Sequence, residues 1–147
     1  MENTVLTQQE IQLAGLIIRE TAGITDLEQI IVFTICLWFV IKDVFGITAA
    51  NQLVEATQSC IPTLNDSHIT SPTQVVKDAV GRVDDVSLGE TNISVFKVTV
   101  MCLMKRVQHL CGEDAAENLA RAYKAILKSL RHESRTTNFA VDRMVWN

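Results

Sequence analysis

The sequence predicts an all-α fold, and three observations favour this class. Residues 30–41 read IIVFTICLWFVI without a charge, and a helix that is apolar on every face belongs at the centre of a helical domain. The 147 residues contain only six Gly and two Pro, few for a β protein full of turns. N-cap signals precede most of the segments with helical periodicity. We therefore expect one domain over residues 1–147, a bundle of six to seven helices around the buried apolar helix.

The first two predicted helices begin at capping boxes. Thr7 lies three residues before Glu10, and Thr25 three residues before Glu28, which is the spacing at which the two residues cap each other. The second helix contains the apolar segment, which is shorter than the roughly 20 apolar residues of a membrane span. These two helices are expected over residues 8–22 and 26–45, and the residues expected to face the core from the first are Ile11, Leu13, Ile17 and Ile18.

A third helix is predicted over residues 49–60, beginning at Thr48 and stopped by Pro62. It holds few large apolar residues, so we expect it at the periphery of the bundle. Residues 61–70, IPTLNDSHIT, are predicted to form a loop.

The fourth helix is expected to begin at Ser71, with Pro72 at its first helical position. Gly81 lies inside the helical pattern, so the helix either ends there or bends. Residues 84–91 are polar and are expected to lead to the next helix. The apolar stripe of this fourth helix consists of Val75, Val76, Ala79, Val80 and Val83.

Two long helices are predicted to follow. The fifth begins at Thr91 or Asn92 and runs to Leu110; its start, NISVFKVTV, also fits a strand, but helical spacing continues unbroken through MCLMKRVQHL. The sixth covers residues 113–131 and has the clearest amphipathic face of the chain, made of Leu119, Tyr123, Ile126, Leu127 and Leu130. A last short helix is expected over residues 137–145, and it would bring to the bundle Phe139, Met144 and Trp146.

The net charge of −4 is unevenly distributed along the chain. Residues 1–95 carry −8 and residues 96–147 carry +4. An acidic chain argues against a dedicated nucleic-acid binder. Two interpretations of the basic part stay open. In the first, the basic part neutralises the acidic part within one domain. In the second, the basic part forms a face for an anionic partner or a membrane surface, with membrane contact at most peripheral.

The cysteines and the N-terminus indicate a reducing, cytoplasmic environment. No CxxC occurs, and Cys36 and Cys102 lie in apolar helical runs, where a thiol packs as a small hydrophobe. The N-terminus, MENTVLTQQE, has no basic residue before an apolar stretch, so no signal peptide is expected.

The sequence offers few residues in catalytic or metal-binding patterns. The three histidines, His68, His109 and His132, have no carboxylate or cysteine at metal-ligand spacing. No phosphate-binding loop, GxGxxG or GxSxG motif is present. The chain has the length of a globin, but no histidine lies in the apolar part of the fifth helix, where a haem ligand would be expected. We therefore expect no metal, no cofactor and no enzymatic activity.

Residues 71–110, SPTQVVKDAVGRVDDVSLGETNISVFKVTVMCLMKRVQHL, combine an amphipathic helix, an acidic turn and an Asn-led apolar helix. In this order they resemble the Bcl family of apoptosis regulators, in which an Asn-Trp-Gly-Arg motif opens a buried hairpin of two helices. Asn92 occupies the place of the motif's Asn, CGEDAAENLARAYKAILKSL resembles the second hairpin helix, and Trp146 could stand for the family's terminal Trp. The next three residues, ISV, depart from Trp-Gly-Arg, and no C-terminal membrane anchor is expected, which fits a divergent member such as a viral one.

A second similarity to this family lies in the segment WFVIKDVF. The family's third homology motif, its death-ligand helix, has the pattern Leu-x-x-Ile-Gly-Asp-x-Phe. Lys42 replaces the small residue of that pattern, and Trp38 fits an ordinary core position as well. The residues that match by type and spacing are Trp38, Ile41, Asp43 and Phe45.

The resemblance implies a hydrophobic groove that binds an amphipathic helix and is built from the predicted second to fifth helices. In the family, the Arg of the Asn-led motif pairs with an Asp of the bound helix. Here Lys97 could substitute, although it lacks the bidentate fork of Arg. The apolar candidates also fit ordinary core positions, and Asn92 fits a helix cap. The candidate groove residues are Val76, Val80, Asn92, Phe96, Lys97 and Val100.

Together these observations predict a cytoplasmic binding protein. The resemblance implies an apoptosis regulator that sequesters the death-ligand helices of pro-apoptotic partners, also at the mitochondrial surface, with host–virus interaction as one setting. A homodimer stays open, and no nucleic-acid partner is expected. Two alternatives stand beside this reading. One is a structural helical bundle, such as a coat or assembly subunit whose acidic and basic halves support head-to-tail association. The other is a small cytoplasmic enzyme with an unrecognised site.

Overall fold

The computed structural model describes residues 6–133, with side chains described through Leu130. Over this range the chain is helical without a strand, which confirms the predicted class. No helix in the same range is long and apolar enough to cross a bilayer, and the helix predicted over residues 137–145 lies outside it. The described helices are α1 (Gln8–Glu20), α2 (Asp26–Phe45), α3 (Ile47–Cys60), α4 (Asp66–Thr70), α5 (Gln74–Ser87), α6 (Asn92–Cys111) and α7 (Glu113–Glu133).

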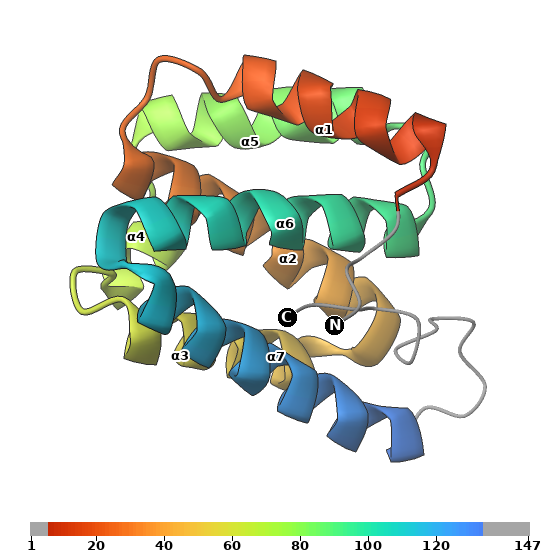
Figure 1. Cartoon of the computed structure of the whole chain (residues 1–147), viewed down its shortest axis with the longest axis vertical. Coiled ribbons are helices and arrows are strands. Elements are labelled where there is room, and N and C mark those ends of the chain that lie inside the picture. The colour runs from red at the N-terminus through yellow and green to blue at the C-terminus, as the bar shows by residue number, and fades with distance from the viewer. Residues whose placement is uncertain (1–5, 134–147) are drawn as a thin grey trace.

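The helices form three layers, with α2 and α6 in the middle (Figure 1). Helices α1 and α5 cover one side, α3 and α7 cover the other, and the short α4 packs on α2. The middle position of α2 and α6 agrees with their many apolar residues, since α2 contributes ten buried residues and α6 seven. A helix that is apolar over most of its circumference is stable only where neighbouring helices cover it.

Thr7 and Thr25 cap α1 and α2 as the sequence predicts. Thr7 Oγ1 accepts a hydrogen bond from the Glu10 backbone N–H at 3.0 Å, and Thr25 Oγ1 accepts one from the Glu28 N–H at 3.1 Å. Each Glu carboxylate in turn accepts from the backbone N–H of its Thr at 3.0 Å. These bonds satisfy backbone donors that the first turn of a helix leaves unpaired. Helix α2 has the predicted bounds and ends at Gly46, whose φ of +99° suits glycine.

Two corrections concern the segment around α3 and α4. Helix α3 begins at Ile47, directly after the glycine that ends α2, and not at Thr48. Residues 61–70 are not all loop, since α4 occupies their second half. Its N-cap is Asn65, and His68 Nδ1 accepts a hydrogen bond from the Asn65 backbone N–H at 2.9 Å. The sequence does not reveal this helix because five residues are too few to show an apolar period.

Helix α5 also differs from the prediction at both ends. It begins at Gln74, and Thr73, not Ser71, is its N-cap. Gly81 does not end it, because the helix continues to Ser87, through the first half of the segment expected to be a polar connection. A glycine inside a helix costs about 1 kcal/mol relative to alanine, which the packing of a buried face readily offsets.

Four apolar residues that the sequence places on inward faces or in the buried segment face solvent instead. Ile11 and Ile18 of α1 are 51% and 60% exposed, Val75 of α5 is 48% exposed, and Phe39 of α2 is 46% exposed. The expected inner face of α1 is therefore correct only for Leu13 and Ile17. The apolar segment of α2 is not enclosed on every side, since it opens to solvent at Phe39.

The four thiols differ in burial, and we expect them to differ in reactivity. None forms a disulfide; Cys111 is exposed, whereas Cys36 and Cys102 are buried. Burial raises the pKa of Cys36, and it raises that of Cys102 to about 11 against the opposing effect of Arg106 and Lys105. Because the thiolate is the reactive form, a chromogenic disulfide reagent should label Cys111 first and leave Cys36 and Cys102 unlabelled until the protein unfolds. Equal labelling of all thiols without denaturant would contradict this burial pattern.

Candidate functional site

The candidate site is an apolar groove between α1 and α6, which we call the α1–α6 groove. Its volume of about 310 Å³ lies at the lower end of the range for ligand pockets. The polar side chains along it are Thr21, Gln29, Lys105 and Arg106. Its apolar lining consists of Ala14, Ile18, Ala22, Phe33, Met101 and Cys102.

Two exposed side chains contribute apolar surface from the two sides of the groove. Ile18 belongs to α1, and Met101 of α6 is 39% exposed. Ile11 lies seven residues before Ile18, so both occupy the same face of α1 and the apolar surface continues beyond the groove. Exposed apolar side chains beside a concave pocket are typical of a surface that binds another protein.

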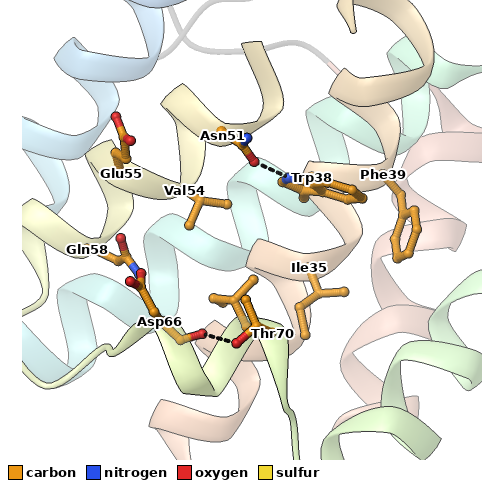
Figure 2. A pocket seen from close by; sticks show the side chains of 10 residues that line it. Ile35, Trp38, Phe39, Asn51, Val54, Glu55, Gln58, Asp66 and Thr70 are labelled. Atoms are coloured by element: carbon orange, nitrogen blue, oxygen red, sulfur yellow. Dashed lines mark hydrogen bonds between the residues drawn. The ribbon is translucent and has the colours of Figure 1, made fainter. Parts of the chain in front are cut away.

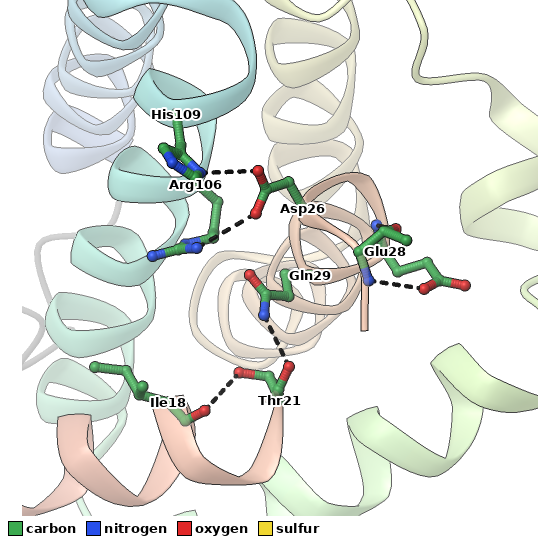
Figure 3. Close-up of polar contacts among 8 residues, drawn as sticks. Ile18, Thr21, Asp26, Glu28, Gln29, Arg106 and His109 are labelled. Atoms are coloured by element: carbon green, nitrogen blue, oxygen red, sulfur yellow. Dashed lines mark hydrogen bonds and ion pairs between the residues drawn. The ribbon is translucent and has the colours of Figure 1, made fainter. Parts of the chain in front are cut away.

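Gln29 supplies an unpaired hydrogen-bond acceptor to the groove. Its Nε2 donates to the backbone carbonyl of Thr21 at 2.8 Å, which fixes the orientation of the amide (Figure 3). The Gln29 Oε1 atom is buried and accepts no hydrogen bond from the side chains described through residue 130 or from the described backbone. A buried acceptor without a partner costs roughly 1–3 kcal/mol.

Arg106 and Lys105 place positive charge along the α6 side of the groove. Arg106 Nη1 lies 3.3 Å from Asp26 Oδ1, and His109 Nδ1 lies 2.9 Å from Asp26 Oδ2, so Asp26 ties the start of α2 to the last turns of α6 (Figure 3). Lys105 is exposed and forms no hydrogen bond or ion pair with another described residue. It is therefore the cation that a ligand carboxylate could reach without breaking an existing pair.

Lys97, the predicted partner of an acidic ligand, pairs with Glu10 at the contact between α1 and α6. Lys97 Nζ lies 3.1 Å from Glu10 Oε1, and the Ser94 hydroxyl donates to Glu10 Oε2 at 2.7 Å. The Lys97 and Glu10 side chains are only 16% and 5% exposed. Burial alone raises the pKa of Glu10, but hydrogen bonds from Thr7, Ser94 and Lys97 outweigh it and hold that pKa below 4.5, its usual value. The predicted ligand role of Lys97 would thus compete with this internal pair.

The other predicted groove residues lie away from the α1–α6 groove. Val76, Phe96 and Val100 are buried in the core, and Val80 is half-buried. Asn92 is the exposed first residue of α6. Helix α5 packs on α1 and α2, whereas α6 packs on α1, α2 and α7, and none of these five residues lines either pocket described here. Their part in peptide binding stays a prediction.

The segment that resembles the death-ligand motif lies in the C-terminal half of α2. Ile41 is buried, Phe45 is half-buried and Asp43 is exposed. Trp38 lines a second pocket, between α2, α3 and α4, where its indole N–H donates to Asn51 Oδ1 at 3.0 Å (Figure 2). The four matching residues thus have different surroundings and do not form one exposed row of anchors.

Sequence reasoning missed the residues that define the groove, although a signal for them exists. Ile11, Ala14 and Ile18 follow helical spacing and form a second apolar stripe on α1, beside the buried one. The helical pattern shows that such a stripe exists, but not whether a neighbour covers it. Nothing in the sequence marks Gln29 as an unpaired acceptor, because its pairing depends on the packing of α1 against α2.

The groove combines apolar surface with a few polar side chains. Its polar side chains are one hydroxyl, one amide and two cations, and burial raises the pKa of its thiol, Cys102, to about 11. Among the described residues, no group of His, Cys, Asp and Glu is arranged to hold a metal ion. The groove can remove apolar side chains from water and pair with a carboxylate.

Comparison with models of protein families, with curated proteins and with solved structures found no match. The resemblance to the Bcl family therefore rests on the residues quoted above.

Proposed function

We propose that this protein is a Bcl-like apoptosis regulator that binds the amphipathic death-ligand helix of a pro-apoptotic partner and performs no catalysis. Its place of action would be the cytoplasm and the mitochondrial surface. Support comes from the resemblance over residues 71–145 and 38–45, and from a bundle with two long helices in its middle layer. The single observation that carries the proposal is the open, apolar α1–α6 groove with a cation beside it.

The groove fits the two chemical features of such a ligand. An amphipathic helix presents apolar anchors along one face, and these would cover Phe33, Ile18 and Met101. Covering apolar surface stabilises the complex by about 25 cal/mol for each Å² removed from water. The Asp of the death-ligand motif would then lie near Lys105. In the family an Arg fills this role, whereas a lysine supplies the charge without the bidentate geometry.

Titration of a fluorescent death-ligand helix, followed by anisotropy, should give a Kd of about 1 µM or below, near −8 kcal/mol. The double variant Ile18→Ala/Met101→Ala should weaken binding roughly thirtyfold, as loss of a binding hot spot does. Both side chains are substantially exposed, so the free energy of unfolding should change by roughly 0.5 kcal/mol per site. Leu88→Ala, at a site that is 78% exposed and outside the groove, is the control and should leave binding unchanged.

Charge reversal distinguishes binding in the α1–α6 groove from non-specific electrostatic attraction. Lys105→Glu should weaken binding about tenfold at low ionic strength, and a peptide with Lys in place of the motif Asp should restore it. Lys128→Glu, the same change on the exposed face of α7, should have little effect. Failure of every helix in a panel to bind would contradict the proposal. A salt-sensitive rise in particle mass by light scattering, without helix binding, would favour the structural subunit instead.

A further inference from the structure

The second pocket, which we call the α3 pocket, shares no lining residue with the α1–α6 groove, although α2 contributes to both (Figure 2). It has a volume of about 540 Å³ between α2, α3 and α4. The Trp38 and Phe39 rings meet edge to face, with centroids 5.2 Å apart and planes at 83°. The indole is further held by Asn51, so the aromatic wall is ordered before any ligand arrives. The apolar lining consists of Ile35, Trp38, Phe39, Val54 and Ile69.

The apolar and polar surface of this pocket extends along one face of α3. Ile47, Asn51, Val54 and Gln58 follow the spacing i, i+4, i+7 and i+11, so they share a face, and Ile47 is 55% exposed. From Ile47 to Gln58 the helix rises about 16 Å at 1.5 Å per residue. A surface of this length matches about three turns of a ligand helix, and it exceeds what a compact small molecule would cover.

The rim of the α3 pocket is acidic. Glu55 is exposed and has no hydrogen bond or ion pair with any side chain described between residues 6 and 130. Asp66 Oδ1 accepts a hydrogen bond from Gln58 Nε2 at 2.6 Å, which keeps this carboxylate at the pocket (Figure 2). No Lys or Arg is among the lining residues. Just beside the pocket, Lys42 Nζ lies 5.1 Å from the Trp38 ring centroid, so this indole already attracts one cation.

We propose that the α3 pocket binds a basic amphipathic helix of a partner protein. Apolar side chains of that helix would pack on Trp38, Phe39 and Val54, and its Lys or Arg side chains would lie beside Glu55 and Asp66. This ligand would meet carboxylates, whereas the death-ligand helix proposed for the α1–α6 groove would place its motif Asp near the cation Lys105. The two sites would therefore select different partners, and the α3 pocket does not depend on the function proposed above.

Trp38 provides a direct readout of this site. In a Trp146→Phe variant of the full chain, Trp38 is the remaining tryptophan. We would titrate two model amphipathic peptides with the same Leu face, one with Lys along its edges and one with Glu. The Lys peptide should change the Trp38 emission saturably and bind about tenfold more tightly than its Glu twin at low ionic strength. The difference should shrink near 1 M salt, where charges are screened within about 3 Å.

Matched variants locate the contact. Glu55→Lys should weaken binding of the Lys peptide about fivefold, as expected for an exposed charge pair, and Phe39→Ala about tenfold. Glu117→Lys on α7 and Ile18→Ala in the other groove should leave it unchanged. Equal binding of the two peptides, an unchanged Trp38 emission, or an equal effect of Glu117→Lys would overturn the proposal. A change of oligomeric mass with Glu55→Lys would also overturn it, in favour of a second copy of this chain as the occupant.

Discussion

Replacing Leu37 with alanine is expected to lower the free energy of unfolding by about 2–5 kcal/mol. Leu37 is 1% exposed and lies in α2, in the middle of the three layers. Helices on both sides pack closely around it, so they can fill only part of the cavity that the truncation leaves. Urea denaturation followed by far-UV circular dichroism measures the change.

Leu88→Ala is the matched control for this prediction. It removes the same atoms from a side chain that is 78% exposed at the end of α5, so the stability should change by roughly 0.5 kcal/mol or less. If Leu37→Ala were as mild as Leu88→Ala, the placement of α2 in the middle layer would be wrong.

The second large effect is expected for Glu10→Gln, which should destabilise the protein by about 3 kcal/mol at neutral pH, near the lower end for breaking a buried ion pair. The substitution keeps the shape of the side chain but removes the charge that faces Lys97, and it weakens the acceptor for the Ser94 hydroxyl. The lower end applies because the Lys97 side chain is still 16% exposed and can reach water in part.

This contribution should depend on pH with a defined sign. The pKa of Glu10 is lowered in the folded state, so its stabilisation is complete above the unfolded value of 4.5 and is lost as the pH falls through the folded value. The gap in unfolding free energy between the wild type and Glu10→Gln should therefore close on acidification. Glu20, like Glu10, belongs to α1, and its pair with Arg82 of α5 is more exposed, so Glu20→Gln should cost less than about 1 kcal/mol. A gap that stays constant below pH 4.5 would contradict the assigned role of Glu10.

Local signals in the sequence predict the helices well. The capping boxes at Thr7 and Thr25 involve residues three apart, so the sequence alone determines them, and both helices begin where these signals place them. The start of α5 shows the limit of such signals. Ser71 and Thr73 both qualify as caps, and the helix begins after Thr73. Local sequence does not distinguish the two, because it does not encode how α5 packs against α1 and α2.

Contacts between distant residues explain what the sequence does not predict. Glu10 is recognisable as a capping residue, but its burial depends on Ser94 and Lys97, which lie 84 and 87 positions away. Ile18 and Phe39 are large and apolar like core residues, and only the arrangement of neighbouring helices leaves them exposed. For the same reason the predicted groove residues on α5 and α6 are mostly core, while the open groove lies between α1 and α6.

The most direct test of the proposed function is a methyl NMR titration of the protein labelled with ¹³C-methyl methionine. Met101 lines the α1–α6 groove, and Met104, one turn further along α6, does not. Assigned by Met→Leu substitution, the Met101 resonance should shift saturably as the death-ligand helix is added, with the Kd found by anisotropy, and the Met104 resonance should shift much less. A helix that binds while the Met101 resonance stays in place, or that shifts Met104 more, would contradict binding in the α1–α6 groove.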